Sequence, residues 1–276
     1  MADTGVRAPA PAKINLALLV GPLRPDGKHE VATVLQRVDL GDRVTLCRGD
    51  GLSVDGFPED TIVRRALERL AARAGTVPRW HVRIEKHVPV AAGLGGGSSD
   101  AATALRLANQ TLAAPLPGPD LGAVAAEIGS DVPFFLGSGP ALGTGDGSEL
   151  ETLQLPQDYW VVLVLPRGAV KASTADVYRR FDERRGEAGF AERRAALLEA
   201  VGSCARARDL ARLPPNDLAR SPLARLLVEL GAFRADVSGA GPAVYGLFLH
   251  RDAARGAARS LRGAGRTWVT APAWYG

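Results

Sequence analysis

Hydrophobic residues along the chain form short runs and two kinds of periodicity, which predict alternating strands and helices. Continuous apolar runs predict buried strands, and the alternation of apolar with polar residues over 80–84 predicts a half-buried strand. The strands expected in the first half cover 14–20, 31–38, 43–47 and 80–84, with a turn at Leu40-Gly41-Asp42 between the second and the third. Residues 1–10, rich in Ala and Pro, are expected to fray.

Helices are predicted where a helical pattern follows a capping residue. Asp60 or Thr61 is expected to cap a helix that reaches Ala74, with Gly75 just past its end. An Ala- and Leu-rich helix is expected over 101–112, and a further helix, capped by Asp120, over 120–128.

The second half repeats the alternation of strands and helices. A buried strand over 159–165 precedes several Arg-rich helices, and a strand over 244–250, a helix over 252–262 and a strand over 267–270 follow. The polar, Pro-containing stretch between Leu150 and Asp158 indicates a boundary, so we expect domains at 1–152 and 153–276. Each half is then a sheet covered by helices.

The composition is that of a globular protein: 46% of the 276 residues are hydrophobic and 23% are charged, which excludes a disordered chain. The net charge is +4, but the arginines are scattered beside acids. This favours solvated helix faces, or a polyanionic small substrate, over nucleic acid. No apolar run in the sequence could cross a bilayer and no signal peptide is recognisable. The two cysteines lack metal-binding spacing, which indicates reduced thiols in a cytoplasmic protein.

The densest glycine stretch carries the strongest chemical signal. It opens the helix expected over 101–112 and reads Gly93-Leu94-Gly95-Gly96-Gly97-Ser98-Ser99-Asp100. Glycine permits positive φ, so backbone N–H groups can converge on an anion, and a helix N-terminus adds unpaired N–H groups. The hydroxyls and the carboxylate suit a polyphosphate and its Mg²⁺. A flexible turn with a Ser cap is the less favoured alternative, and neither the Walker A nor the Rossmann spacing fits.

Three weaker clusters accompany the glycine stretch. Lys13 and Asn15 point to the same face of a predicted strand, which is either an edge or a site. Asp131 precedes an apolar run, where it either caps a helix or orients and deprotonates a hydroxyl. A glycine loop at 238–241 precedes the strand over 244–250 and in isolation is read as a tight turn.

Taken together, the four segments resemble the GHMP family of small-molecule kinases. The family's phosphate loop is matched by 89–101, its N-terminal Lys strand by 11–16, its acidic motif by 129–133 and its C-terminal glycine motif by 238–243. The resemblance implies an α+β fold of two domains. The N-terminal one would be like the second domain of ribosomal protein S5 and the C-terminal one ferredoxin-like, with both ligands in the cleft between them.

Within the family, the stretch 24–30, the triple glycine before Ser98 and the segment 129–133 are similar to one branch. That branch transfers the γ-phosphate of ATP to the 2-hydroxyl of a CDP-linked methylerythritol, in non-mevalonate isoprenoid biosynthesis. The resemblance implies small-molecule partners only, with neither nucleic acid nor membrane, and a monomer or weak homodimer.

The resemblance also implies a role for each matching residue. Asp131 matches the catalytic carboxylate and Lys13 its partner lysine, which stabilises the developing alkoxide. The expected ATP- and phosphate-binding residues are Lys86 (near the adenine), Pro89, Gly93, Leu94, Gly95, Gly96, Gly97, Ser98, Ser99 and Asp100, with Mg²⁺ at Ser99. The expected substrate-binding residues are Asn15, Lys28, His29 (to the cytosine edge), Thr174, Tyr178 (stacked on cytosine), Ser238, Gly239 and Gly241.

Two positions depart from the family pattern. Lys28 stands where the family usually has Tyr, so one face of an aromatic sandwich around the base is missing, and Thr61 stands where Asn is usual. Two alternatives therefore stay open. One is a GHMP kinase for homoserine, mevalonate or a sugar, against which His29 argues. The other is a non-catalytic nucleotide-binding protein, against which the presence of both Lys13 and Asp131 argues.

Overall fold

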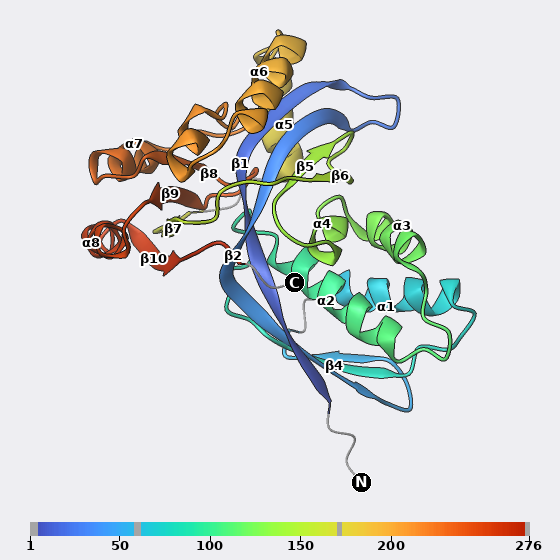
Figure 1. Cartoon of the computed structure of the whole chain (residues 1–276). Helices are drawn as coiled ribbons and strands as arrows, with labels where there is room; N and C mark the ends of the chain where they lie inside the picture. The colour runs from blue at the N-terminus through green and yellow to red at the C-terminus, as the bar shows by residue number, and fades with distance from the viewer. Residues whose placement is uncertain (1–4, 58–61, 170–172, 274–276) are drawn as a thin grey trace.

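Two sheets organise the chain, which the computed structural model describes over residues 5–57, 62–169 and 173–273 (Figure 1). The first sheet has six strands in the order β3-β4-β2-β5-β6, with β1 also paired to β2. Its strands are β1 (Val6–Leu23), β2 (His29–Arg48), β3 (Ser53–Asp55), β4 (Trp80–Glu85), β5 (Ala141–Thr144) and β6 (Glu149–Thr152). The second sheet has four strands in the order β10-β7-β9-β8. They are β7 (Trp160–Pro166), β8 (Arg234–Val237), β9 (Val244–Phe248) and β10 (Gly265–Thr270).

The two long strands β1 and β2 run through most of the molecule (Figure 1), and two predictions about them are wrong. Residues 6–10 do not fray but pair with 42–46, and 31–47 contains no chain-reversing turn. A register shift next to Pro11 lets β2 continue through Gly41. Prolines are tolerated in β1 because its only strand partner among the described residues is β2.

Helices cover both sheets. They are α1 (Ile62–Arg73), α2 (Gly96–Gln110), α3 (Gly118–Ile128), α4 (Val132–Leu136), α5 (Thr174–Glu183), α6 (Phe190–Gly202), α7 (Pro222–Glu229) and α8 (Arg251–Ser260), with a 3₁₀ turn at Ala207–Arg212. Most agree with the predicted elements to within a few residues. Helix α2 begins earlier, inside the glycine stretch, and α3 is preceded by Pro117 rather than capped by Asp120. The expected cap at Asp60 or Thr61 lies outside the described residues.

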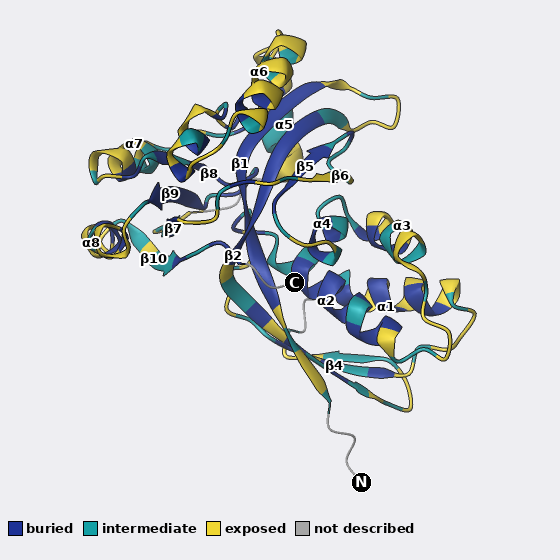
Figure 2. Ribbon diagram, viewed as in Figure 1, coloured by how far each residue is buried: buried dark blue, intermediate teal, exposed yellow. Residues whose placement is uncertain are grey.

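The two faces of the β1–β2 pair contribute to different cores, because successive side chains on a strand point to opposite faces. Leu35 packs with α1, α2 and α4, whereas Ile14 and Val34 pack with residues of β7 and β9. The central part of both strands is therefore buried throughout (Figure 2). Polar side chains here, such as Lys13 and Asn15, are each only 4% exposed. No helix in the described part of the chain is both long and apolar enough to span a membrane.

Candidate active site

A cavity of about 610 Å³ gathers segments from the whole length of the chain. Most of the predicted site residues line it: Lys13, Asn15, Lys86, Pro89, Gly93, Leu94, Gly95, Gly96, Gly97, Ser98, Asp131, Thr174, Tyr178, Gly239 and Gly241. A second hollow of about 460 Å³ holds Lys28 and His29 and shares Tyr178 and Thr174 with the first. Ser99, Asp100 and Ser238 line neither and lie behind the cavity wall.

Lys13 and Asp131 meet in this cavity although 118 positions of sequence, by their numbers, separate them. The Nζ atom of Lys13 lies 3.3 Å from Oδ2 of Asp131. The Lys13 side chain is 5% exposed and that of Asp131 is 40% exposed. Asp131 occupies the N-cap position of α4, but its side chain accepts no capping hydrogen bond from the described backbone. The carboxylate is therefore open to a ligand rather than used by the helix.

A chain of hydrogen bonds aims the lysine. Lys13 Nζ donates to Oδ1 of Asn15 over 2.8 Å, and Nδ2 of Asn15 donates to Oγ1 of Thr33 over 2.8 Å. The Thr33 hydroxyl in turn donates to the carbonyl of Ala17. In addition, the backbone N–H of Lys13 donates to the carbonyl of Leu94, so β1 and the glycine loop are joined directly. The ammonium group is thus held beside the loop.

The glycine loop is shaped by contacts that only glycine permits. Gly93 has φ +83°, and a Cβ atom there would lie 2.3 Å from the carbonyl oxygen of Ser238. A Cβ atom at Gly241 would lie 2.3 Å from the backbone of Ala92. The Ser238 hydroxyl donates to the Gly93 carbonyl over 2.9 Å. Ser238 therefore supports the loop, and the loop feeds the N-terminus of α2, where unpaired N–H groups favour an anion.

Behind the loop lies a buried charge cluster of Lys86, Asp42 and Asp100. Lys86 Nζ donates to Oδ2 of Asp42 over 2.5 Å and to Oδ2 of Asp100 over 2.7 Å. Burial raises the pKa of Asp100 to about 8, against the opposing effect of Lys86 and with help from Asp42. Burial alone would lower the pKa of Lys86, but the two carboxylates outweigh it and raise that pKa. The Asp100 carboxylate is thus occupied by Lys86 and does not face the cavity.

Oxygen donors suited to Mg²⁺ are present at the cavity, although the described residues contain no cluster of three or more His, Cys, Asp or Glu arranged for a metal. Mg²⁺ is usually held by one or two protein oxygens together with substrate phosphates. Ser98 and the half-exposed Asp131 carboxylate line the cavity. The Ser99 hydroxyl is fully buried and lacks a hydrogen-bond partner among the described residues. Ser98, which faces the cavity, therefore fits the ion better than the buried Ser99 does.

An aromatic cluster forms the second hollow. The rings of His29 and Tyr178 stack with centroids 5.1 Å apart at 29°, and Phe181 meets His29 edge-on. The Nδ1 atom of His29 lies 2.9 Å from the carbonyl of Gly21, which can only accept. Nδ1 must therefore carry the proton, so in the neutral ring Nε2 is an acceptor. Nε2 lies 3.3 Å from Oδ1 of Asp182.

Lys28, the residue that departs from the family pattern, forms an ion pair with Asp146. The Ser130 and Ser148 hydroxyls also donate to Asp146, over 3.1 and 2.6 Å. Burial raises the pKa of Asp146, but these hydrogen bonds outweigh it and hold the pKa below its ordinary value. Asp146 lines both hollows, so it marks the passage between them.

Sequence reasoning missed several lining residues. Asp146 and Ser130 stand at the junction of the hollows, Thr33 supports Asn15, and Phe57 and Ile62 lie near Lys86 at the far end. Ser130 could have been found as the neighbour of Asp131. Asp146 stands within Thr144-Gly145-Asp146-Gly147-Ser148, a glycine-rich pattern that reads as an ordinary turn.

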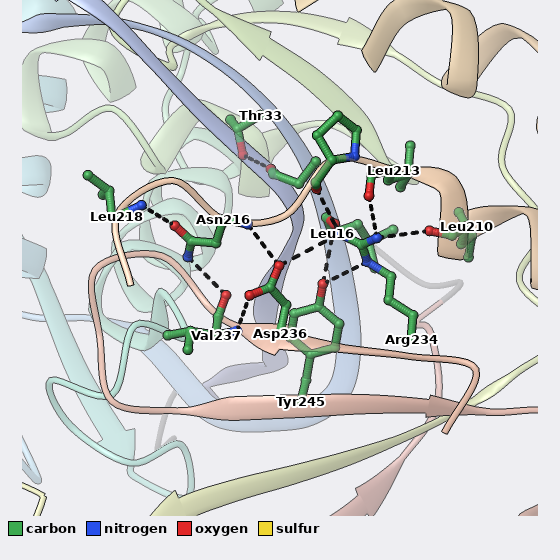
Figure 3. Close-up of polar contacts among 12 residues, drawn as sticks. Leu16, Thr33, Leu210, Leu213, Asn216, Leu218, Arg234, Asp236, Val237 and Tyr245 are labelled. Carbon is green, nitrogen blue, oxygen red and sulfur yellow. Dashed lines mark hydrogen bonds and ion pairs between the residues drawn. The ribbon is translucent and has the colours of Figure 1, made fainter. Parts of the chain in front are cut away.

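A buried polar network ties the second sheet to β1 at the site (Figure 3). The pairing of β1 with β2 skips Leu16, which leaves the Leu16 carbonyl free to accept from Nη2 of Arg234 over 2.5 Å. Asp236 accepts from the N–H of Asn216, and Nδ2 of Asn216 donates to the carbonyl of Gly239 over 2.8 Å. The network therefore holds both the irregularity beside Asn15 and the glycine turn at the cavity.

Comparison with known proteins agrees with this arrangement. Models of the GHMP kinase N-terminal domain and of the GHMP kinase C-terminal region match residues 61–139 and 221–267. A 4-diphosphocytidyl-2-C-methyl-D-erythritol kinase of Anaeromyxobacter dehalogenans is 44% identical over 92% of this chain and 84% of its own length. A kinase of the same name from Geobacter sulfurreducens is 37% identical over 95% of this chain and 96% of its own length.

Solved structures show the same fold. A crystal structure of 4-(cytidine 5'-diphospho)-2C-methyl-D-erythritol kinase superposes with a TM-score of 0.76 at 33% identity, covering 97% of this chain and 100% of that one. A mevalonate kinase superposes equally well, with a TM-score of 0.75 over 97% and 99%, but at 12% identity, and so shows the fold alone.

Proposed function

The chain belongs to the GHMP kinase family and, within it, to the 4-diphosphocytidyl-2-C-methyl-D-erythritol kinases, and from this we propose its reaction in terms of its own residues. It transfers the γ-phosphate of ATP to the 2-hydroxyl of 4-diphosphocytidyl-2-C-methyl-D-erythritol, a step of non-mevalonate isoprenoid biosynthesis. The observation that carries the proposal is the meeting of Lys13 and Asp131, 3.3 Å apart, in the cavity lined by the glycine loop.

At the reacting centre the acceptor hydroxyl lies between Lys13 and Asp131. Its oxygen forms the new bond to the γ-phosphorus while the bond from that phosphorus to the bridging oxygen of ADP breaks. Asp131 takes the hydroxyl proton, and Lys13 stabilises the charge that develops on the oxygen. Phosphoryl transfer depends mainly on positioning and charge neutralisation, so these two groups and the phosphate site suffice.

The ATP site in this proposal runs along the glycine loop. The backbone N–H groups of 95–97 and the start of α2 bind the phosphates, with Ser98 contributing its hydroxyl. Lys86, Phe57 and Ile62 line the end of the cavity where the adenine would lie. The Ser98 hydroxyl would hold Mg²⁺ together with the ATP phosphates, and the ion, when bound, neutralises charge on the transferring phosphoryl group.

The nucleotide end of the acceptor occupies the second hollow. The Asp182 carboxylate, which lies beside Nε2 of His29, offers an acceptor to the exocyclic amine that distinguishes cytosine from uracil. Tyr178 offers its ring to the base, and Thr174 lines the same wall. Lys28, in place of the usual aromatic residue, is drawn toward Asp146 and leaves that face of the base open. Because the reaction consumes ATP, we expect it to take place in the cytoplasm.

The test measures ADP release with Mg²⁺ and ATP, using 4-diphosphocytidyl-2-C-methyl-D-erythritol, homoserine, mevalonate and the uridine analogue as acceptors. We expect turnover with the cytidine compound, and a fall of about 10²–10⁴-fold in kcat for Asp131→Asn because the proton acceptor is lost. Preference for homoserine or mevalonate would show that the proposed substrate is wrong. Near-normal turnover by Asp131→Asn would show that this carboxylate is not the proton acceptor. ATP binding without turnover of any acceptor would favour the non-catalytic alternative.

A further inference from the structure

Arg37 carries a buried charge beside the short helix that follows Asp131. It lies on β2 and is 1% exposed. Its Nη2 atom donates to the carbonyl of Phe134 over 3.0 Å and also to the carbonyl of Gly137, which follows α4 directly. The guanidinium carbon lies 5.2 Å from the centre of the Phe134 ring. Arg37 therefore links strand β2 to the C-terminal end of α4.

The charge of Arg37 has no carboxylate to balance it, since none of the ion pairs formed within the described ranges includes Arg37. Burial, with a smaller effect of Arg106, lowers the pKa of Arg37 to about 10. A buried charge that is met only by carbonyl groups and a ring is costly, and an apolar residue of similar volume usually fills such a place at no loss of stability. Core stability alone does not explain the residue.

The register of the sheet places Arg37 directly opposite Lys13. Side chains opposite one another in an antiparallel pair share a face, and two like charges there repel. Here the two cations extend to opposite ends of α4. Lys13 lies 3.3 Å from Asp131 at the first end, and Arg37 binds the carbonyls of Phe134 and Gly137 at the other.

Helix α4 depends on such contacts for its orientation. It has five residues, far fewer than an isolated helix needs for stability. The Asp131 side chain forms no capping bond that would fix the carboxylate to the described backbone of α4. The position of the carboxylate is therefore set by where the body of the helix sits.

We propose that Arg37 is a positioning residue: by holding the C-terminal end of α4 it fixes the Asp131 carboxylate against Lys13. The inference rests on the proposed function, because it assigns Arg37 to the geometry of that reaction. Arg37 lines neither hollow, so it acts on kcat and leaves ligand binding unchanged.

The test compares Arg37→Met and Arg37→Lys with the wild type. We expect Arg37→Met to lower kcat about 100-fold, because a displacement of about 1 Å costs that much, with KM for ATP changed less than twofold. Arg37→Lys keeps the charge but loses the paired N–H donors of the guanidinium group. Its kcat should therefore lie between those of the wild type and Arg37→Met. Arg69→Met is the control, since Arg69 is an exposed arginine on α1 of the same domain, and it should match the wild type.

A double-mutant cycle separates positioning from a merely structural role. In an Asp131→Asn background, Arg37→Lys should change kcat less than twofold, since the group that it positions is already gone. The same loss in both backgrounds would overturn the proposal, as would a wild-type kcat in Arg37→Met. If Arg37→Met does not fold, the Arg37→Lys cycle alone distinguishes the two roles.

Failure of the proposed function is distinguishable from failure of this inference. If the wild type transfers no phosphate, the reaction assignment falls. Crystal structures of the wild type and Arg37→Lys still test the positioning. A longer Lys13 Nζ to Asp131 Oδ2 distance in the variant supports it, and an unchanged distance overturns it.

Discussion

Asp100 is a carboxyl group whose ionisation the fold opposes. It is 1% exposed, and of its two oxygens only Oδ2 has a hydrogen-bond partner among the described residues, which is Lys86. Asp42, on the other side of Lys86, also accepts from the N–H groups of His87 and Val88. Two carboxyl groups thus share one ammonium group, and the one with fewer donors is the one that retains a proton.

This arrangement predicts a pH dependence of stability. The pKa of Asp100 is about 8 in the folded protein, against an ordinary value of 3.8 that applies to the unfolded chain. Between these values the folded state holds a proton that the unfolded state has lost, so the free energy of unfolding falls as pH rises from about 4 to about 8. Asp100→Asn removes this dependence. Urea denaturation at pH 6 and pH 9 should show a larger loss for the wild type than for Asp100→Asn, and equal losses would contradict the shift.

The residues that we propose to bind ligands were easier to predict from sequence than the residues that hold them in place. Lys13, Asp131 and the glycine loop carry their chemistry in short patterns, and the family resemblance that they suggested is confirmed. Arg37 stands within a predicted strand and Asp42 within a predicted turn. Their partners are 97 and 44 positions away along the chain, a separation that no local pattern encodes.

Strand β2 shows why element boundaries were harder to predict than element types. Leu40-Gly41-Asp42 has the residues of a turn, yet Gly41 lies against the backbone of Ala10 and Pro11, where a Cβ atom would come within 2.8 Å. The close approach needs glycine for pairing with β1, not for reversing the chain. Likewise α2 starts within the glycines, after Gly95 in the left-handed conformation and without a side-chain cap, at the end that we propose binds phosphate.

The glycine loop predicts a paired result for two alanine substitutions. Gly93→Ala should destabilise the protein by about 1–3 kcal/mol from its positive φ alone, with a further loss from overlap with Ser238, and should raise KM for ATP. Gly139→Ala is the control. Gly139 has φ +74° but nothing within 4 Å of a Cβ atom, so only the strain applies.

Urea denaturation and ATP titration of both variants measure the difference. Equal destabilisation of Gly93→Ala and Gly139→Ala would show that the contact between the loop and the Ser238 turn contributes nothing.

At the scale of the whole molecule, one buried cluster contains residues of both sheets. Ile14 and Val34 of the first sheet pack with Val161 and Leu247 of the second. Arg234 adds hydrogen bonds to the carbonyls of Leu16, Leu210, Leu213 and Pro214 and to the hydroxyl of Tyr245. The division at the end of β6 therefore separates the two sheets, but one of the buried clusters spans both sides of that division.

This predicts that Arg234→Met is costly. It removes the cation beside Asp236 and leaves several buried carbonyls without their donor, so we expect a loss of about 3–5 kcal/mol in the free energy of unfolding. The control is Arg225→Met on α7, whose side chain is 85% exposed and should change stability by less than about 0.5 kcal/mol. Calorimetry of the wild type should show one cooperative transition. Two separated wild-type transitions would contradict the shared core.

The contact between Gly93 and Gly241 limits how parts of related enzymes can be recombined. Each position requires glycine because the opposite backbone lies too close for a side chain. The two positions belong to opposite halves of the chain. A chimera that joins the first half of this protein to the second half of a relative should fold and be active only where the relative has glycine at the position of Gly241. The two glycines therefore form a complementary pair, and a recombined enzyme must keep both of them.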